Sequence, residues 1–146
     1  MVGQGLAVRI CEICSVRLSL AGVRGFSGDE QADRKHHGGV EKAVCVYPVE
    51  HYEYWHEHLP ELALPHGAFG ENLTTSGLLE SGVSVGDVYE LGEAIVQVSQ
   101  PRQPCWKLAR RWRVKDLSAR WSARASRGFT SGCCVTEMLR PGMSWC

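Results

Sequence analysis

The segment Ser99-Gln-Pro-Arg-Gln-Pro-Cys105 carries the residues of this chain that are best suited to chemistry. A cysteine stands at its end, just past an expected strand, with two prolines and Arg102 before it. Proline fixes φ and lacks a backbone donor, so we expect a stiff connection. The neighbouring cation Arg102 favours the thiolate of Cys105, which is the form that attacks electrophiles or binds metal. Because a thiolate is a soft ligand, the segment predicts a transition-metal site at Cys105, with a small buried cysteine as the alternative.

The elements that must position this segment are short. Polar, glycine-bounded loops are expected over 25–39 and 67–72. A buried strand is expected over 42–47, and Val49, Tyr52, Trp55 and Leu59 predict an amphipathic helix over 48–59 with Tyr52 and Trp55 in the core. From Val83 the apolar period changes to two, which predicts short antiparallel strands of the kind found in barrels, over 83–91 and 95–98. Two short helices are expected over 105–112 and 115–120.

Length and composition place limits on the function. The 146 residues predict one domain. The 16 Lys and Arg balance the 16 Asp and Glu, so the chain has no net charge and lacks the basic excess of a nucleic-acid-binding protein. No apolar run approaches the roughly 20 residues of a membrane helix, and we expect no signal peptide in residues 1–20. A soluble cytoplasmic protein is therefore expected, and the seven cysteines argue against a disulfide framework.

Five short motifs stand in a fixed order along the chain: GDEQAD (28–33), HGGVEKAV (37–44), FGENLT (69–74), VGDVYELG (85–92) and VSQPRQPCWKL (98–108). In this order and spacing they resemble the MOSC domain family, named for the molybdenum cofactor sulfurase C-terminal domain. The resemblance is greatest to the stand-alone bacterial YiiM-like branch. It covers roughly residues 25–120, within a single domain that we expect to span 1–146.

The resemblance implies a mainly β fold, a MOSC-type β-barrel with a few short helices. It also implies a molybdenum cofactor of the molybdopterin type, with Cys105 in the place of the cysteine that ligates molybdenum. Related members reduce N-hydroxylated compounds, including toxic base analogues such as N-hydroxylaminopurine, and take electrons from flavin or iron–sulfur proteins. Pyridoxal phosphate binding is implied at the level of the family only. The alternative is a module that carries sulfur or the cofactor without turnover, because a fold does not fix a function.

Further site residues follow from the same motifs. A pterin cofactor bears a phosphate, which Arg102 can bind in bidentate fashion and Lys42 as a point charge; surface charges are the alternative for both. His37 is the candidate proton donor, with a structural histidine as its alternative. Gly38 and Gly39 permit close backbone approach to a ligand. Asn72 is expected either to bind the pterin or to hold its loop.

The two ends of the chain, 1–24 and 121–146, depart from the family pattern. They hold five of the seven cysteines, and Trp121–Cys146 shows no strand pattern. The resemblance predicts a segment of the type G-x-x-F-R-V-L after Arg120. A shifted reading frame permits this segment. In that frame the codons of Cys133 and Cys134 together encode its leucine, whichever cysteine codons are used. We hypothesise two compensating frame changes, near 22–25 and 120–121, which sequencing of the encoding DNA tests.

This hypothesis has a structural consequence. A barrel without its closing strands exposes an unpaired edge, so a translated end at Trp121–Cys146 is expected to be poorly packed and the chain weakly active or inactive. A mis-read gene product with no function is thus a third possibility. The Cys11-Glu-Ile-Cys14 pair supplies only half of a zinc site, because structural zinc normally needs four ligands.

Overall fold

The computed structural model of the chain describes residues 9–10, 42, 44–91, 94–124 and 126–135. Within these residues it contains six strands: β1 (Arg9–Ile10), β2 (Val44–Pro48), β3 (Leu73–Ser76), β4 (Val88–Leu91), β5 (Ala94–Pro101) and β6 (Phe129–Val135). The same residues contain three α-helices: α1 (Glu50–His58), α2 (Trp106–Trp112) and α3 (Leu117–Ala123). Two 3-10 turns, Pro60–Leu62 and Glu80–Gly82, complete the described elements.

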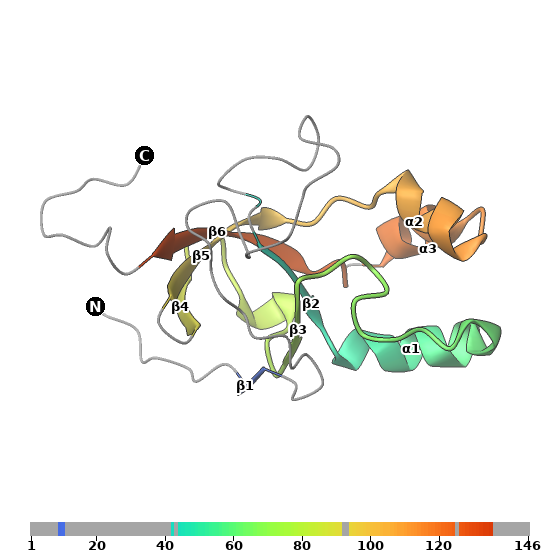
Figure 1. Cartoon of the computed structure of the whole chain (residues 1–146), viewed down its shortest axis with the longest axis horizontal. Coiled ribbons are helices and arrows are strands. Elements are labelled where there is room, and N and C mark those ends of the chain that lie inside the picture. The colour runs from blue at the N-terminus through green and yellow to red at the C-terminus, as the bar shows by residue number, and fades with distance from the viewer. Residues whose placement is uncertain (1–8, 11–41, 43, 92–93, 125, 136–146) are drawn as a thin grey trace, which may run out of the picture.

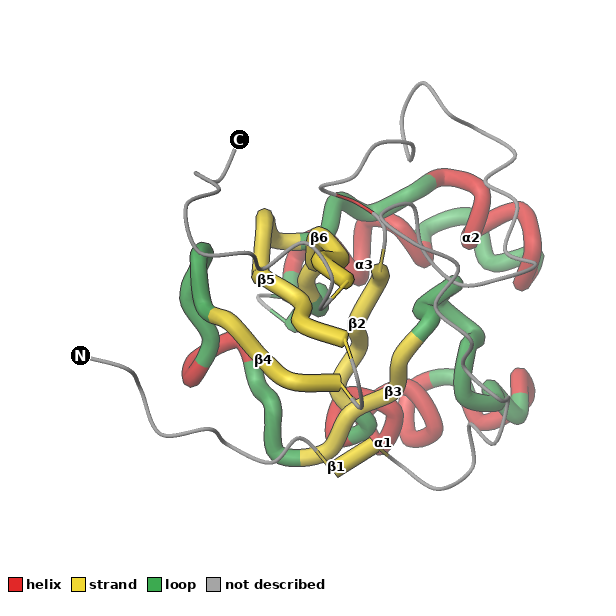
Figure 2. Tube along the Cα trace, turned by 60° about the vertical axis from the view of Figure 1, so that its left-hand side comes forward, coloured by secondary structure: helices red, strands yellow, loops and turns green. Residues whose placement is uncertain are grey.

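The strands form one mixed sheet in the order β1-β3-β2-β6-β5-β4. β2 and β3 are parallel, and the other neighbours are antiparallel. The sheet curls towards a barrel (Figure 2), while the helices gather at one end of it (Figure 1). This arrangement confirms the mainly β, barrel-like fold with a few short helices.

Two apolar clusters hold the fold together, one on each face of β2. Val44 and Val46 lie among residues of the curled sheet, together with Leu73, Leu78, Val96, Val98 and Phe129. Tyr47 points to the opposite face, because side chains alternate along a strand, and packs into an aromatic cluster with the helices. Tyr52 and Trp55 of α1 are 2% and 0% exposed, which confirms them as core residues.

The strand expected over 83–91 begins only at Val88. The residues before it form a turn, in which Asp87 accepts the backbone N–H of Ser84 at 2.7 Å and Gly86 donates to the carbonyl of Val98 at 2.8 Å. Val85 is 65% exposed, so the apolar alternation there does not reflect a buried strand face.

The expectation of a strandless, poorly packed end was wrong for its described residues 121–124 and 126–135, in the backbone pairing of β6 and in the burial of Trp121 and Phe129. Trp121 is fully buried, Phe129 is 4% exposed, and β6 lies between β2 and β5 in the sheet. A strand that pairs on both sides is stabilised by two backbone ladders, so it forms without regular apolar alternation. Among the described residues, no helix combines the length and apolar character that a membrane span requires.

Candidate functional site

Arg102 is the first residue after β5, and its side chain turns inward. Only 9% of the residue is exposed, so it is not the surface charge that was the alternative prediction. Its Nη2 donates to the carbonyl of Phe69 at 2.7 Å, and the guanidinium lies 5.0 Å from the centre of the Trp121 ring. Its Nη1 has no hydrogen-bond partner among the described residues. A buried, charged N–H donor without a hydrogen-bond partner lowers the stability of the fold unless a further group binds it.

Cys105 immediately precedes α2, in extended backbone, and is half-buried. Its carbonyl accepts the N–H of Leu108 at 3.1 Å and the hydroxyl of Ser118 at 3.0 Å, so the backbone of Cys105 ties α2 to α3. The thiol is not in a disulfide. The end of the proline-flanked segment is therefore fixed by two helices, and Cys105 as a residue is partly exposed.

Phe69, the residue that Arg102 contacts, lies in the loop 67–72, which is organised around the buried carboxylate of Glu71. That carboxylate accepts the N–H of Gly67 at 2.7 Å and of Phe69 at 3.1 Å. It also accepts the hydroxyls of Thr74, at 3.1 Å, and of Tyr52. Sequence analysis missed Glu71, although its position within the FGENLT motif, in a glycine-bounded loop, is a signal that could have found it.

The phenol that donates to Glu71 remains protonated. Burial, and then the charge of Glu71, raise the pKa of Tyr52 well above its usual value. Burial likewise raises the pKa of Tyr47, whose hydroxyl accepts the indole N–H of Trp55 at 2.8 Å. These neutral phenols act as hydrogen-bonding supports for α1 and the loop 67–72.

Asn72 links this loop to the sheet. Its side-chain oxygen accepts the N–H of Cys45 at 2.8 Å, and its own N–H donates to the carbonyl of Cys45 at 2.8 Å. The structure therefore gives Asn72 the loop-holding contact that was one of its two predicted roles. Lys42 is half-buried and stands two residues before β2.

Several predicted residues lie outside the described part of the chain. They are the candidate proton donor His37, the glycines Gly38 and Gly39, and the cysteines Cys11 and Cys14. Within the described ranges, no three His, Cys, Asp or Glu side chains cluster as a metal site. Of the predicted site residues, the structure thus places Arg102, Cys105, Asn72 and Lys42.

The described residues suit an anionic, metal-bearing group. Arg102 offers a buried cation with an unused donor, and Cys105 offers a soft sulfur ligand three residues away along a stiff segment. Trp121 and Phe69, which border the guanidinium, were not predicted as site residues. Trp121 belongs to the part of the chain that departed from the sequence pattern, and no local signal indicated its contact with Arg102.

Comparison with known proteins agrees with this fold. A family model described as MOSC domain matches residues 33–143. Protein YflK of Bacillus subtilis, which is uncharacterised, is 55% identical over 104 residues, covering 71% of this chain and 47% of that protein. Protein YiiM of Escherichia coli is 52% identical over 96 residues, covering 64% of this chain and 43% of YiiM. The chain therefore spans about half the length of these relatives.

A more distant relative and the solved structures extend the comparison. A protein named reductase from Gibberella moniliformis is 36% identical over 134 residues, which cover 83% of this chain and 24% of that protein. The crystal structure of YiiM from Escherichia coli has a TM-score of 0.70 at 39% identity and covers 81% of this chain and 55% of YiiM. A crystal structure of a hypothetical protein has a TM-score of 0.72 at 43% identity, with coverage of 81% and 53%.

Proposed function

The chain belongs to the MOSC domain family, and from this membership we propose that it binds a molybdenum cofactor of the molybdopterin type and reduces N-hydroxylated small molecules. The observation that carries the proposal is the buried guanidinium of Arg102, which keeps an unused donor at Nη1. A buried cation with a free donor is suited to an anionic ligand, and the cofactor supplies one through its phosphate.

Different residues of the chain would bind different parts of the cofactor. Cys105 would hold the metal through its sulfur, and Arg102 would hold the anionic part of the cofactor. Lys42, Asn72, Gly38 and Gly39 are proposed as further contacts. When bound, the cofactor supplies the two-electron chemistry, and the protein supplies position and charge.

The proposed reaction converts an N-hydroxyl group into an amine and water. It consumes two electrons and two protons, and His37 is proposed to deliver a proton to the departing oxygen. The electrons would come from a flavin or iron–sulfur protein in the cytoplasm. A relative that is named reductase supports a reductive reaction in general.

A second candidate, a sulfur or cofactor carrier, is favoured by the partial exposure of Cys105. In that case the thiol would hold sulfur as a persulfide or bind the cofactor for delivery. The two candidates differ in what the purified protein contains, so one experiment separates them.

The experiment compares Cys105→Ser with Cys45→Ser, a matched control that also replaces a half-buried cysteine and that bonds Asn72 through its backbone N–H and carbonyl. We expect Cys105→Ser to lower molybdenum content and N-hydroxylated purine reduction at least about tenfold, because losing even a supporting residue weakens metal binding about 10–100-fold. Cys45→Ser should retain both. Sulfane sulfur on Cys105 without molybdenum would support the carrier. Equal molybdenum content in the wild type, Cys105→Ser and Cys45→Ser would refute the assignment of Cys105 as the molybdenum ligand.

A further inference from the structure

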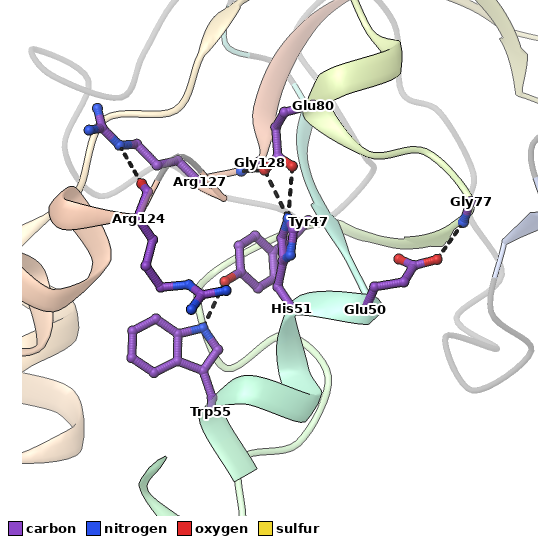
Figure 3. Close-up of polar contacts among 9 residues, drawn as sticks. All are labelled: Tyr47, Glu50, His51, Trp55, Gly77, Glu80, Arg124, Arg127 and Gly128. Atoms are coloured by element: carbon purple, nitrogen blue, oxygen red, sulfur yellow. Dashed lines mark hydrogen bonds and ion pairs between the residues drawn. The ribbon is translucent and has the colours of Figure 1, made fainter. Parts of the chain in front are cut away.

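A cluster around the carboxylate of Glu80 joins three segments that are distant in sequence (Figure 3). Glu80 of the 3-10 turn points both oxygens at Nε2 of His51 in α1, at 3.0 and 2.8 Å. Its Oε1 also accepts the backbone N–H of Gly128 at 2.5 Å. The side chain of Glu80 is 25% exposed and that of His51 is 9% exposed, so this contact is largely shielded from water.

Gly128 connects this cluster to Arg102. Its N–H donates to Glu80, while its carbonyl accepts the backbone N–H of Arg102 at 3.1 Å. Gly128 has a φ of 72°, and a Cβ there would lie 2.3 Å from the carbonyl oxygen of Val46. The residue is thus enclosed against β2 and bonded at both its N–H and its carbonyl, so a single residue bridges Glu80 and the backbone of Arg102.

Resting on the function proposed above, we propose that Glu80 is a positioning residue, which holds the backbone of Arg102 through Gly128 so that the guanidinium faces the ligand. Arg102 is then held at two points. Glu80 and Gly128 fix its backbone, and Phe69 and Trp121 fix its guanidinium. Only Gln103 and Pro104 separate Arg102 from Cys105, so the same contact also anchors the start of the segment that presents the thiol.

The charge of Glu80 suits this role. Burial alone would raise its pKa, but hydrogen bonds from His51 and Gly128 outweigh burial and lower the pKa below its usual value. The ring of His51 packs edge-on against Tyr47, at 5.3 Å between ring centres. The ionised form of Glu80, which is the stronger acceptor for the N–H of Gly128, is therefore the favoured one.

The chain offers a matched control in Glu50, which neighbours His51 in α1 (Figure 3). Its Oε1 accepts the N–H of Gly77 at 2.6 Å and lies 3.4 Å from the hydroxyl of Ser76. Glu50 thus holds a glycine N–H as Glu80 does, but its contacts lead to the end of β3. A general effect of losing a carboxylate–glycine bond would appear in both variants.

The experiment measures residue-specific amide hydrogen exchange by NMR in the full chain, for Glu80→Ala, Glu80→Gln and Glu50→Ala. In the wild type, local opening at Arg102 must also disturb the charge-assisted bond between Gly128 and Glu80. Glu80→Ala removes that bond, so opening costs less free energy. We expect exchange at the Arg102 amide to accelerate about tenfold after correction for global stability. Glu80→Gln keeps the size and one acceptor oxygen, so it should restore most of the protection. Glu50→Ala should accelerate exchange at Gly77 and leave Arg102 unchanged.

Molybdenum content of the same purified variants gives a second measurement. We expect Glu80→Ala to lower it and Glu50→Ala to leave it at the wild-type level. Unchanged exchange at Arg102 in Glu80→Ala, or equal acceleration in Glu50→Ala, would overturn the positioning role whatever the molybdenum content. If Glu80→Ala does not fold, Glu80→Asp replaces it, because its carboxylate is one methylene too short to keep the contact with the N–H of Gly128; accelerated exchange at Arg102 is again expected, and unchanged exchange would overturn the role. A wild-type protein without molybdenum would instead refute the proposed function, and the exchange data would still decide the role of Glu80.

Discussion

At the scale of single residues, the site depends on charged side chains that the fold encloses and bonds to backbone. Glu71 accepts two backbone N–H groups and two hydroxyls, and Glu80 accepts one N–H group and faces a histidine. Charges taken out of water need such partners, because each unpaired group costs free energy. Arg102 differs, since its Nη1 has no such bond within the described residues. Arg124 likewise has a buried Nε without a partner there, but of these two arginines only Arg102 lies in a motif that predicted ligand binding.

Glu80 also gives the stability of the protein a pH dependence. Its pKa in the folded state lies below the ordinary value of 4.5, so the folded state favours the ionised carboxylate. Its contribution to the free energy of unfolding is therefore present above 4.5 and is lost as pH falls through the lowered folded-state pKa. We expect the stability difference between wild type and Glu80→Gln to shrink over that window.

Urea unfolding at a series of pH values measures this difference. Glu50→Gln serves as the comparison, because Glu50 also accepts a glycine N–H, that of Gly77 at 2.6 Å, but at the end of β3. A wild-type advantage over Glu80→Gln that stays constant to the lowest pH would contradict the prediction.

At the scale of elements, the site is built where secondary structure ends. Arg102 follows β5, Cys105 precedes α2, and Gly128 precedes β6. The loop 67–72 stands just before β3 and carries both Phe69 and Glu71. Regular elements fix the ends of these connections, and the short connections then carry the groups that are suited to binding.

Gly128 is a position in these connections where a side chain does not fit. A Cβ there would meet the carbonyl oxygen of Val46 at 2.3 Å, and a φ of 72° is unfavourable for any other residue. We expect Gly128→Ala to cost at least about 2 kcal/mol in the free energy of unfolding.

Gly77→Ala provides the matched comparison in the same denaturation experiment. Gly77 has a φ of 76°, but a Cβ there would meet nothing within 4 Å. Gly77→Ala should therefore lower the free energy of unfolding only by the cost of placing alanine in a left-handed backbone conformation, about 1–2 kcal/mol. Equal losses in the two variants would show that the contact with Val46 relaxes without cost.

At the scale of the whole molecule, the curled sheet is completed from the last described part of the chain. β6 lies between β2 and β5, and the buried Trp121 packs in the aromatic cluster with Tyr47 and Phe69. The mixed topology therefore brings residues from both halves of the chain around Arg102. The frame hypothesis for residues 1–24 and 121–146 stays a prediction that the DNA sequence will test.

Removal of residues 125–146 should therefore abolish cooperative folding. Without β6, both β2 and β5 would lose a partner, and two open edges favour aggregation. Circular dichroism and urea unfolding measure the loss. Of the described elements, removal of residues 1–10 takes away the short edge strand β1, and it should preserve a cooperative transition. A stable, cooperative protein without residues 125–146 would contradict the central place of β6.

The sequence alone determined the local elements and the family. Apolar spacing predicted α1 and the short antiparallel strands β4 and β5, since each depends on residues close together in the chain. The order of five motifs identified the family, and the proline-flanked segment singled out Arg102 and Cys105. The roles of His37, Gly38 and Gly39 stay predictions, because these residues lie outside the described part of the chain.

Only the tertiary structure decided which groups meet. The bond from Arg102 to Phe69 joins residues 33 positions apart, and that from Gly128 to Glu80 spans 48 positions. Such contacts depend on how the sheet curls, so neither residue type nor local spacing predicts them. The same reason explains β6: backbone pairing on both sides stabilises it, although its sequence lacks the alternation that marks a strand with one buried face.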